Sequence, residues 1–226
     1  MATNTQIDDG GRAQISAAVE AAESGTSGEI VTIIADQSDR YADVALWWSA
    51  LVALIALCAY ALAPDFYLGI VEWIGGGWGE PDKSEILEIA LALVGLKFVA
   101  MRLILQWMPL RLWLTPKRVK ADRVRGRAVR YFKVGAEKRT HGRTGILIYL
   151  SSAEHMAEIV ADEAIHSKIE DSAWGEAMAK LVRAARDNRL ADGMVAAIGD
   201  IGAILAAHFP RAEDDVNELP DRLIEL

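Results

Sequence analysis

The residue types that could do chemistry gather in the stretch EIVADEAIHSK, residues 158–168, where an alternating apolar run ends in charged side chains. Asp162 and Glu163 are adjacent carboxylates, and oxygen ligands of this kind suit Ca²⁺ or Mg²⁺ better than zinc. His166 follows in the same stretch, and histidine is the side chain most often used as a general acid. Three interpretations stay open: a divalent-cation site, a catalytic group, and the solvated end of a strand.

A second chemical candidate is the loop RTHGRTG, residues 139–145. Arg139 and Arg143 could hold the oxygens of a phosphate or of an acidic partner, with His141 beside them as an acid. A metal-dependent phosphatase also requires a nucleophile or a metal-bound water. The chain carries no nucleophile motif, because its only cysteine, Cys58, lies in the most apolar stretch and no glycine-rich phosphate loop follows a strand. The sequence leaves open whether the protein is an enzyme.

The elements that must position these residues are readable from the pattern of apolar side chains. Short β-branched runs predict three strands, EIVTIIA at 29–35, TGILIYLS at 144–151 and MAEIVAD at 156–162. Apolar residues at helical spacing predict helices before the first strand, before the second and after the third. The expected fold class is α/β, a three-layer α/β/α sandwich with a small mixed sheet, interrupted by a two-helix transmembrane hairpin.

The order of these elements places the candidate residues at one edge of the sheet. A helical crossover makes the first two strands parallel, and a short turn makes the third antiparallel to the second. Asp162, Glu163 and His166 therefore leave the third strand where the 139–145 loop enters the second. Asp36 ends the first strand at the opposite edge, so it is not expected to share a site with Asp162.

The segment that interrupts the predicted α/β domain is apolar. The run from Val44 to Ala63 contains no charged residue and is long enough, as a helix, for a ~30 Å hydrocarbon core. A second run, from Ile86 to Met108, has spanning length but contains Lys97. Snorkelling or contact with the first helix would accommodate this lysine, and the alternatives are a functional charge or an interfacial second helix. The predicted organisation is 1–43 as the first part of the α/β domain, 44–115 as the hairpin with a short extracytoplasmic loop, and 116–226 as the remainder.

Aromatic and charged residues suggest an orientation for this hairpin. Trp47 and Trp48 enter the first span, and Trp107 and Trp113 leave the second, as expected for the anchoring belts of a membrane protein. The connection between the spans is acidic, whereas the stretch RLWLTPKRVKADRVRGRAVR, residues 111–130, is strongly basic. Because basic residues favour the cytoplasmic side, both termini are predicted to lie in the cytoplasm.

The basic stretch also raises the question of nucleic-acid binding, since clustered Lys and Arg are its electrostatic footprint. Ala121, Val124 and Ala128 form an apolar stripe at helical spacing that should pack on a core. The stretch directly follows a predicted span, so its basic face is expected to meet anionic lipid headgroups instead. The expected partners are membrane lipids and a protein that the sequence does not identify, with no nucleic acid.

At these elements the chain resembles the TPM domain family, which occurs in bacteria and in chloroplast photosystem-repair proteins. The resemblance rests on the order and spacing of GEIVTII, TGILIYLS with its preceding loop, AEIVADEAI with the acidic loop after it, and the helix DNRLADGMVAAI. The tail HFPRAEDDVNELPDRLIEL is similar to that of bacterial membrane-attached members. The chain departs from the family in its hairpin after the first strand, and in Asp162-Glu163-Ala164 where many members have a glycine-containing loop.

The resemblance implies an α/β/α sandwich, binding of a metal, often calcium, in some members, and acid phosphatase activity in some plant members. We therefore expect a multi-pass protein of a bacterial inner (plasma) membrane, acting as an interaction or assembly and quality-control module at the cytoplasmic face. Ca²⁺ or Mg²⁺ at Asp162 and Glu163 is the candidate cofactor. A metal-dependent acid phosphatase and a calcium-binding sensor are the alternative functions.

Overall fold

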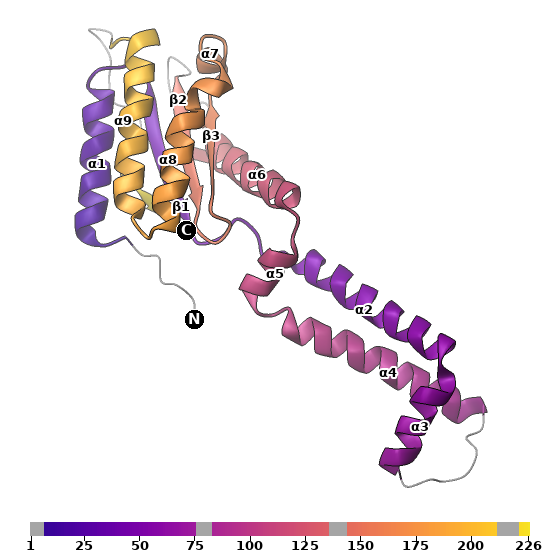
Figure 1. Ribbon diagram of the computed structural model, residues 1–226. Helices are drawn as coiled ribbons and strands as arrows, with labels where there is room; N and C mark the ends of the chain where they lie inside the picture. The colour runs from indigo at the N-terminus through magenta and orange to yellow at the C-terminus, as the bar shows by residue number, and fades with distance from the viewer. Residues whose placement is uncertain (1–6, 76–82, 136–143, 212–221) are drawn as a thin grey trace. The chain divides into compact units, whose positions relative to one another are not determined.

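The chain forms two compact units in the computed structural model, which describes residues 7–75, 83–135, 144–211 and 222–226. Unit 1 comprises Met1–Asp39 and Lys117–Leu226, and unit 2 comprises Arg40–Pro116. Unit 2 therefore interrupts the sequence of unit 1 directly after its first strand. Figure 1 labels most of the elements of both units.

Unit 1 is built on a mixed sheet of four strands in the order β3-β2-β1-β4. β1 (Glu29–Ala35) and β2 (Gly145–Ser151) are parallel, and β2 and β3 (Met156–Ala161) are antiparallel, as the sequence predicts. β4 (Ile224–Glu225) is a short strand that pairs in parallel with β1, and the sequence does not predict it. Every residue of β1 and β2 is buried, which explains why both strands read as continuous apolar runs.

Helices cover both faces of this sheet, so the predicted α/β/α sandwich is confirmed. α1 (Asp9–Glu23), α8 (Gly175–Arg186) and α9 (Leu190–His208) lie on one face, in front of the strands in Figure 1. The core between this layer and the sheet is aliphatic, and its fully buried side chains include Ile15, Ile30, Ile146, Ile148, Ile165, Leu181, Met194 and Leu205. The short helices α7 (Glu163–His166) and η1 (Asp171–Trp174) connect β3 to α8.

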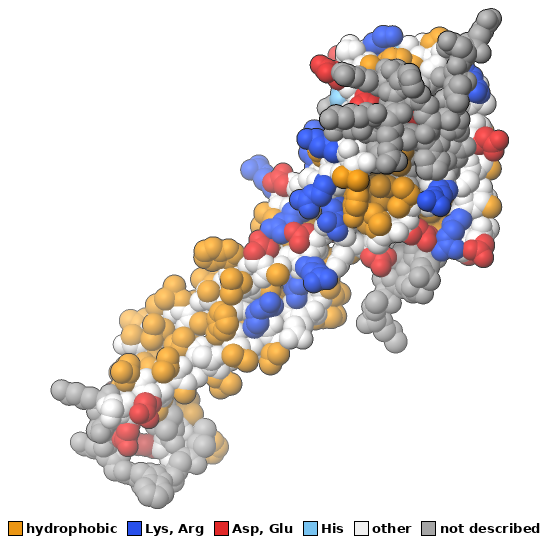
Figure 2. Space-filling model, turned by 180° about the vertical axis from the view of Figure 1, so that it is seen from behind, with side chains coloured by type: hydrophobic (Ala, Val, Ile, Leu, Met, Phe, Trp, Pro, Cys, Tyr) orange, Lys and Arg blue, Asp and Glu red, His pale blue; other side chains and the backbone are white. Residues whose placement is uncertain are grey.

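The other face is covered by α6 (Lys117–Gly135). Val124, Ala128 and Phe132 form the buried stripe of this helix, at the spacing of four residues that keeps side chains on one face. They pack on Val31, Ile33, Ala35, Leu147 and Tyr149 of the sheet. Eight of the other residues of α6 are Lys or Arg, and Figure 2 shows Lys and Arg side chains gathered on the surface of this region.

Unit 2 is a pair of long helices with short helices at their ends. α2 (Ala42–Leu62) packs along α4 (Lys83–Ile104), and α5 (Met108–Leu114) follows. α2 buries a stripe of Ala45, Ser49, Ala53 and Tyr60, whose small members let two helices approach closely. The Tyr60 hydroxyl donates a hydrogen bond to the Ile86 carbonyl oxygen at 3.1 Å. The connection that was expected to be a short loop contains a further helix, α3 (Pro64–Gly75).

Two helices among the described residues are long and apolar enough to cross a membrane, α2 and α9. α9 belongs to the core of unit 1, where its side chains pack on α1 and α8. α4, predicted as the second span, does not meet the same criterion, and it carries Glu85, Glu88, Lys97 and Arg102. α2 is different, because only 22 % of its most apolar window is buried inside the protein.

Candidate functional site

The predicted cation ligand Asp162 lies at the end of β3, where its carboxylate contacts the start of β2. Its Oδ2 accepts a hydrogen bond from the Gly145 N–H at 3.1 Å, and its own N–H donates to the Gly145 carbonyl at 2.9 Å. The residue is 8 % exposed. The Asp162 carbonyl then accepts from Ile165 and His166 and so begins α7. These contacts give Asp162 a structural role at the β2–β3 hairpin.

Two of the other members of the predicted site, Glu163 and His166, lie among the described residues. Glu163 and His166 are exposed on α7. Arg139, His141 and Arg143 lie outside the described residues. No group of three or more His, Cys, Asp and Glu side chains that could hold a metal occurs within the described part of the chain. Cation binding at Asp162 and Glu163 therefore stays a prediction.

Replacing Asp162 by alanine is expected to lower the free energy of unfolding of unit 1 by about 1–3 kcal/mol, because the buried Gly145 N–H loses its acceptor. Thermal or urea unfolding of the purified protein measures this loss. A cation held by Asp162 and Glu163 would also raise the Tm of the wild type in millimolar CaCl₂ or MgCl₂, but not that of the variant. An unchanged stability in Asp162→Ala would contradict the structural role, and a calorimetric titration without heat would contradict the cation site.

A buried polar network lies at the opposite end of the strands, where β1 and β2 end. Glu154, in the turn between β2 and β3, is 6 % exposed. Its carboxylate accepts hydrogen bonds from the Ser38 N–H at 2.9 Å and from the Ser151 hydroxyl. The Ser38 hydroxyl is 3.0 Å from the Tyr149 hydroxyl. The network ties the segment after β1 to the β2–β3 turn, and so fixes the carboxyl ends of both parallel strands.

Burial raises the pKa of Tyr149 above its ordinary value of about 10, and the hydrogen bond with Ser38 offsets part of this rise. Below pH 10 the phenol is neutral in the folded and the unfolded chain, so its contribution to stability is constant. Above pH 10 the unfolded chain ionises first, and stability falls as the pH rises toward the folded pKa. Tyr149→Phe is expected to make this alkaline loss of stability shallower.

The measurement is urea unfolding at a series of pH values from neutral to alkaline, with wild type and Tyr149→Phe compared at each pH. At neutral pH the variant should be less stable by about 1 kcal/mol, because the hydrogen bond to Ser38 is lost. The difference should shrink above pH 10. A constant difference across the whole range would contradict the raised pKa of Tyr149.

A pocket of about 670 Å³ opens on the outer side of β3, within the volume range of ligand sites. We call it the β3 groove. Three elements line it, with α6 and α8 flanking the start of the strand: Lys117, Lys120, Ala121, Val124, residues 154–158, Val182 and Arg186. Sequence reasoning missed this groove, because its residues are far apart in the chain and belong to no motif.

In the β3 groove the acidic side chains already form polar contacts within the protein, whereas three basic side chains form none with the described residues. Glu158 forms an ion pair with Arg125 at 2.9 Å, and Glu154 belongs to the network at the carboxyl edge. Lys117, Lys120 and Arg186 form no hydrogen bond or ion pair with another residue of the described ranges. The groove therefore presents positive charge from both flanking helices.

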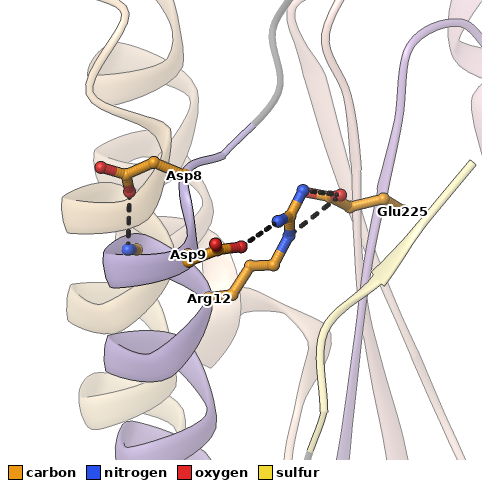
Figure 3. A network of polar contacts seen from close by, with 5 residues as sticks. Asp8, Asp9, Arg12 and Glu225 are labelled. Carbon is orange, nitrogen blue, oxygen red and sulfur yellow. Dashed lines mark hydrogen bonds and ion pairs between the residues drawn. The ribbon is translucent and has the colours of Figure 1, made fainter.

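β4 is fastened to α1 by an exposed polar network, drawn in Figure 3. Arg12 donates to Asp9 at 2.7 Å and to Glu225 at 2.8 Å, while Asp8 caps α1 by accepting from the Gly11 N–H at 2.7 Å. The hydrogen bond to Glu225 is the largest of the effects that raise the pKa of Arg12. The network stabilises the short edge strand and contains no candidate for chemistry.

The predicted anchoring tryptophans are accessible in unit 2. Trp47, Trp107 and Trp113 are 74 %, 62 % and 78 % exposed, and Trp48 is half-buried. They share the surface with many aliphatic side chains of α2 and α4, which Figure 2 shows as an extended apolar surface. Those side chains include Leu46, Leu51, Leu54, Ile55, Leu57, Leu87, Leu91, Leu96, Val99 and Leu103.

Comparison with known proteins supports the fold and goes no further. No family model and no curated protein sequence matches the chain. Among solved structures, the chain is similar to the NMR structure of the BA42 protein from the psychrophilic bacterium Bizionia argentinensis, with a TM-score of 0.57 and 17 % identity over the whole of both chains. At this identity the likeness concerns the arrangement of helices and strands, and it assigns no residue a role.

Proposed function

We propose that the protein is a membrane-anchored interaction module of the TPM type, in which unit 2 enters the bilayer and unit 1 binds a protein partner at the cytoplasmic face of a bacterial plasma membrane. The observation that carries the proposal is the apolar surface of α2 and α4. Water-soluble monomers rarely expose contiguous apolar patches beyond a few hundred Å², whereas side chains that face lipid must be apolar. An exposed row of leucines on a helix of spanning length fits the second environment.

α4 is less apolar than a typical transmembrane helix, because it contains several charged residues. Glu85 and Glu88 lie in its first two turns, where an acidic helix end can remain at the headgroups. Arg102 lies in its last turn, and Lys97 lies seven residues before its end, about two turns inside the helix. Long basic side chains near a helix end extend to the interface, so α4 is compatible with a span beside α2.

The orientation follows from the basic residues of α5 and α6, which continue the chain after α4. Basic segments adjoining a span are retained in the cytoplasm. Asp39 and Lys117, where the chain leaves and re-enters unit 1, would then lie on the same side of the membrane. The family resemblance supports a tethered α/β unit, and the combination of an anchor with a second compact unit supports the interaction role.

The experiment that tests the proposal is a fractionation of cells that express the full chain, followed by a topology assay. The protein should stay in the membrane pellet after an alkaline carbonate wash, and a reporter fused after Leu226 should be active only as a cytoplasmic reporter. Release by the wash would contradict anchoring by unit 2. A reporter active outside the cytoplasm would contradict the orientation while leaving the anchoring intact.

A further inference from the structure

We propose that the β3 groove binds an extended acidic segment of a partner protein, which adds to the sheet as a further strand beside β3. The inference rests on the interaction role proposed above and names the surface and the class of partner. It does not depend on anchoring, because every residue that carries it belongs to unit 1.

The first observation is the open edge of the sheet. β3 is the terminal strand of the order β3-β2-β1-β4, so it is paired with β2 alone among the described strands. In an antiparallel pair, alternate residues direct their backbone groups toward the neighbouring strand. Asp162 pairs with Gly145 in this way, and the register then assigns Val160, Glu158 and Met156 to the same set. Ala157 and Ile159 therefore turn their N–H and C=O groups toward the outer edge.

The second observation is that a groove already lies along this edge. The first half of β3 forms its floor, and Val124 of α6 and Val182 of α8 stand on either side of it. Natural sheets protect exposed edges with short strands, charges, bulges or a covering element. Here the flanking helices leave a pocket of about 670 Å³ over the start of the strand. Space of this kind beside an open strand edge matches the way in which extended peptides bind by strand addition.

The third observation is the positive charge on both sides of the groove, which favours an acidic partner. Lys117 and Lys120 stand on the α6 side and Arg186 on the α8 side. The acids of the groove already have partners, since Glu158 pairs with Arg125 and Glu154 accepts from Ser38. An acidic chain would supply the charges that the three basic side chains lack. A neutral segment would leave these basic side chains without an opposite charge, and a basic segment would be repelled by them.

The geometry of a strand also specifies the spacing of the acidic residues. Successive side chains of a strand point to opposite faces, so residues i and i+2 would face one flanking helix and residue i+1 the other. Three consecutive acidic residues would therefore place two carboxylates at Lys117 and Lys120 and one at Arg186. A segment with the same composition but with its acids separated by single glycines would reach only one wall.

The test measures binding of a fluorescein-labelled peptide, Val-Asp-Glu-Asp-Val with blocked termini, to the full-length protein in a neutral detergent, by fluorescence anisotropy. The triple variant Lys117→Gln/Lys120→Gln/Arg186→Gln should bind about tenfold more weakly, because three exposed ion pairs are lost. The matched control Arg118→Gln/Lys133→Gln/Arg183→Gln removes the same charge from α6 and α8 outside the groove. It should bind within about twofold of the wild type.

Strand addition is tested by changing the peptide and not the protein, so the test does not depend on the folding of a β3 variant. Two isomers are compared, each with N-methyl groups on one of the two alternating sets of amides. One isomer should lose binding and the other retain it, because only one set of N–H groups donates to the β3 edge. Equal binding by both isomers would overturn strand addition.

Equal loss in the two triple variants would overturn the groove as the site. Binding of vesicles containing anionic lipid that depends on Lys117, Lys120 and Arg186, with no binding of the peptide, would also overturn the proposal in favour of a lipid site. Because the assay is done in detergent, its failure would leave the anchoring result of the fractionation experiment unaffected, and the two proposals fail separately.

Discussion

Replacement of Gly202 by alanine is expected to destabilise unit 1 by about 1–3 kcal/mol, the usual cost of overpacking a core. Gly202 lies on α9 where this helix crosses α1. A Cβ added there would lie 2.6 Å from the Ala22 Cβ and 3.3 Å from the Ala22 Cα. Neither atom is the end of a flexible side chain, so the two helices would have to separate. The loss is measured by urea unfolding followed by circular dichroism.

Gly199 provides the matched control, since it lies on the same helix three residues earlier. A Cβ added at Gly199 meets no atom within 4 Å. Gly199→Ala should therefore stabilise the protein by up to about 1 kcal/mol, because alanine is the better helix former. Opposite signs for the two variants would confirm the close crossing of α1 and α9. A destabilisation of the same size in both would contradict it.

Two adjacent arginines in the middle of α2 are expected to remove the protein from the membrane fraction. Leu54 and Ile55 are 56 % and 58 % exposed, so arginine at either position would cost little in water. Inside a bilayer each arginine near the centre of a span costs about 2.5–3.5 kcal/mol on insertion scales. Leu54→Arg/Ile55→Arg should therefore appear in the soluble or degraded fraction of expressing cells.

The control is Leu54→Ala/Ile55→Ala, which shortens the same side chains but keeps them apolar. It should remain with the membranes, because alanine imposes no comparable cost in hydrocarbon. Quantitative immunoblots of membrane and soluble fractions measure both variants. If the arginine variant stays in the membrane pellet at the wild-type level, α2 does not span the bilayer.

The elements that sequence reasoning recovered are those with a repeated physical pattern. β1 and β2 are continuous runs of buried apolar residues, and the short turn around Glu154 allows only a hairpin with β3. β4 escaped notice because a strand of two residues has no period, and its pairing with β1 depends on contacts across the whole chain. α3 escaped notice because Pro64 indicates the end of the first apolar helix, although proline is also tolerated in the first turn of a following helix.

Of the candidate site, the structure tests only the position of Asp162, and the site itself stays a prediction. Antiparallel pairing correctly places Asp162 at the edge where β2 begins, opposite the Glu154 network. The partner of its carboxylate, a backbone N–H of Gly145, is a matter of local geometry that residue types do not reveal. The β3 groove is harder still to foresee, because Lys120 and Arg186 lie in separate helices and their proximity exists only after folding.

The single cysteine offers the most direct test of the account. Cys58 is exposed on α2, and a thiol in water at that position reacts rapidly with maleimides. In intact membrane vesicles we predict that Cys58 resists a charged maleimide and reacts only after denaturation in detergent, since a charged reagent does not enter the hydrocarbon of the bilayer. A Cys58→Ser/Leu54→Cys variant, with the thiol nearer the middle of α2, should be protected at least as well. Rapid labelling of both proteins in intact vesicles would contradict the claim that unit 2 is a membrane anchor.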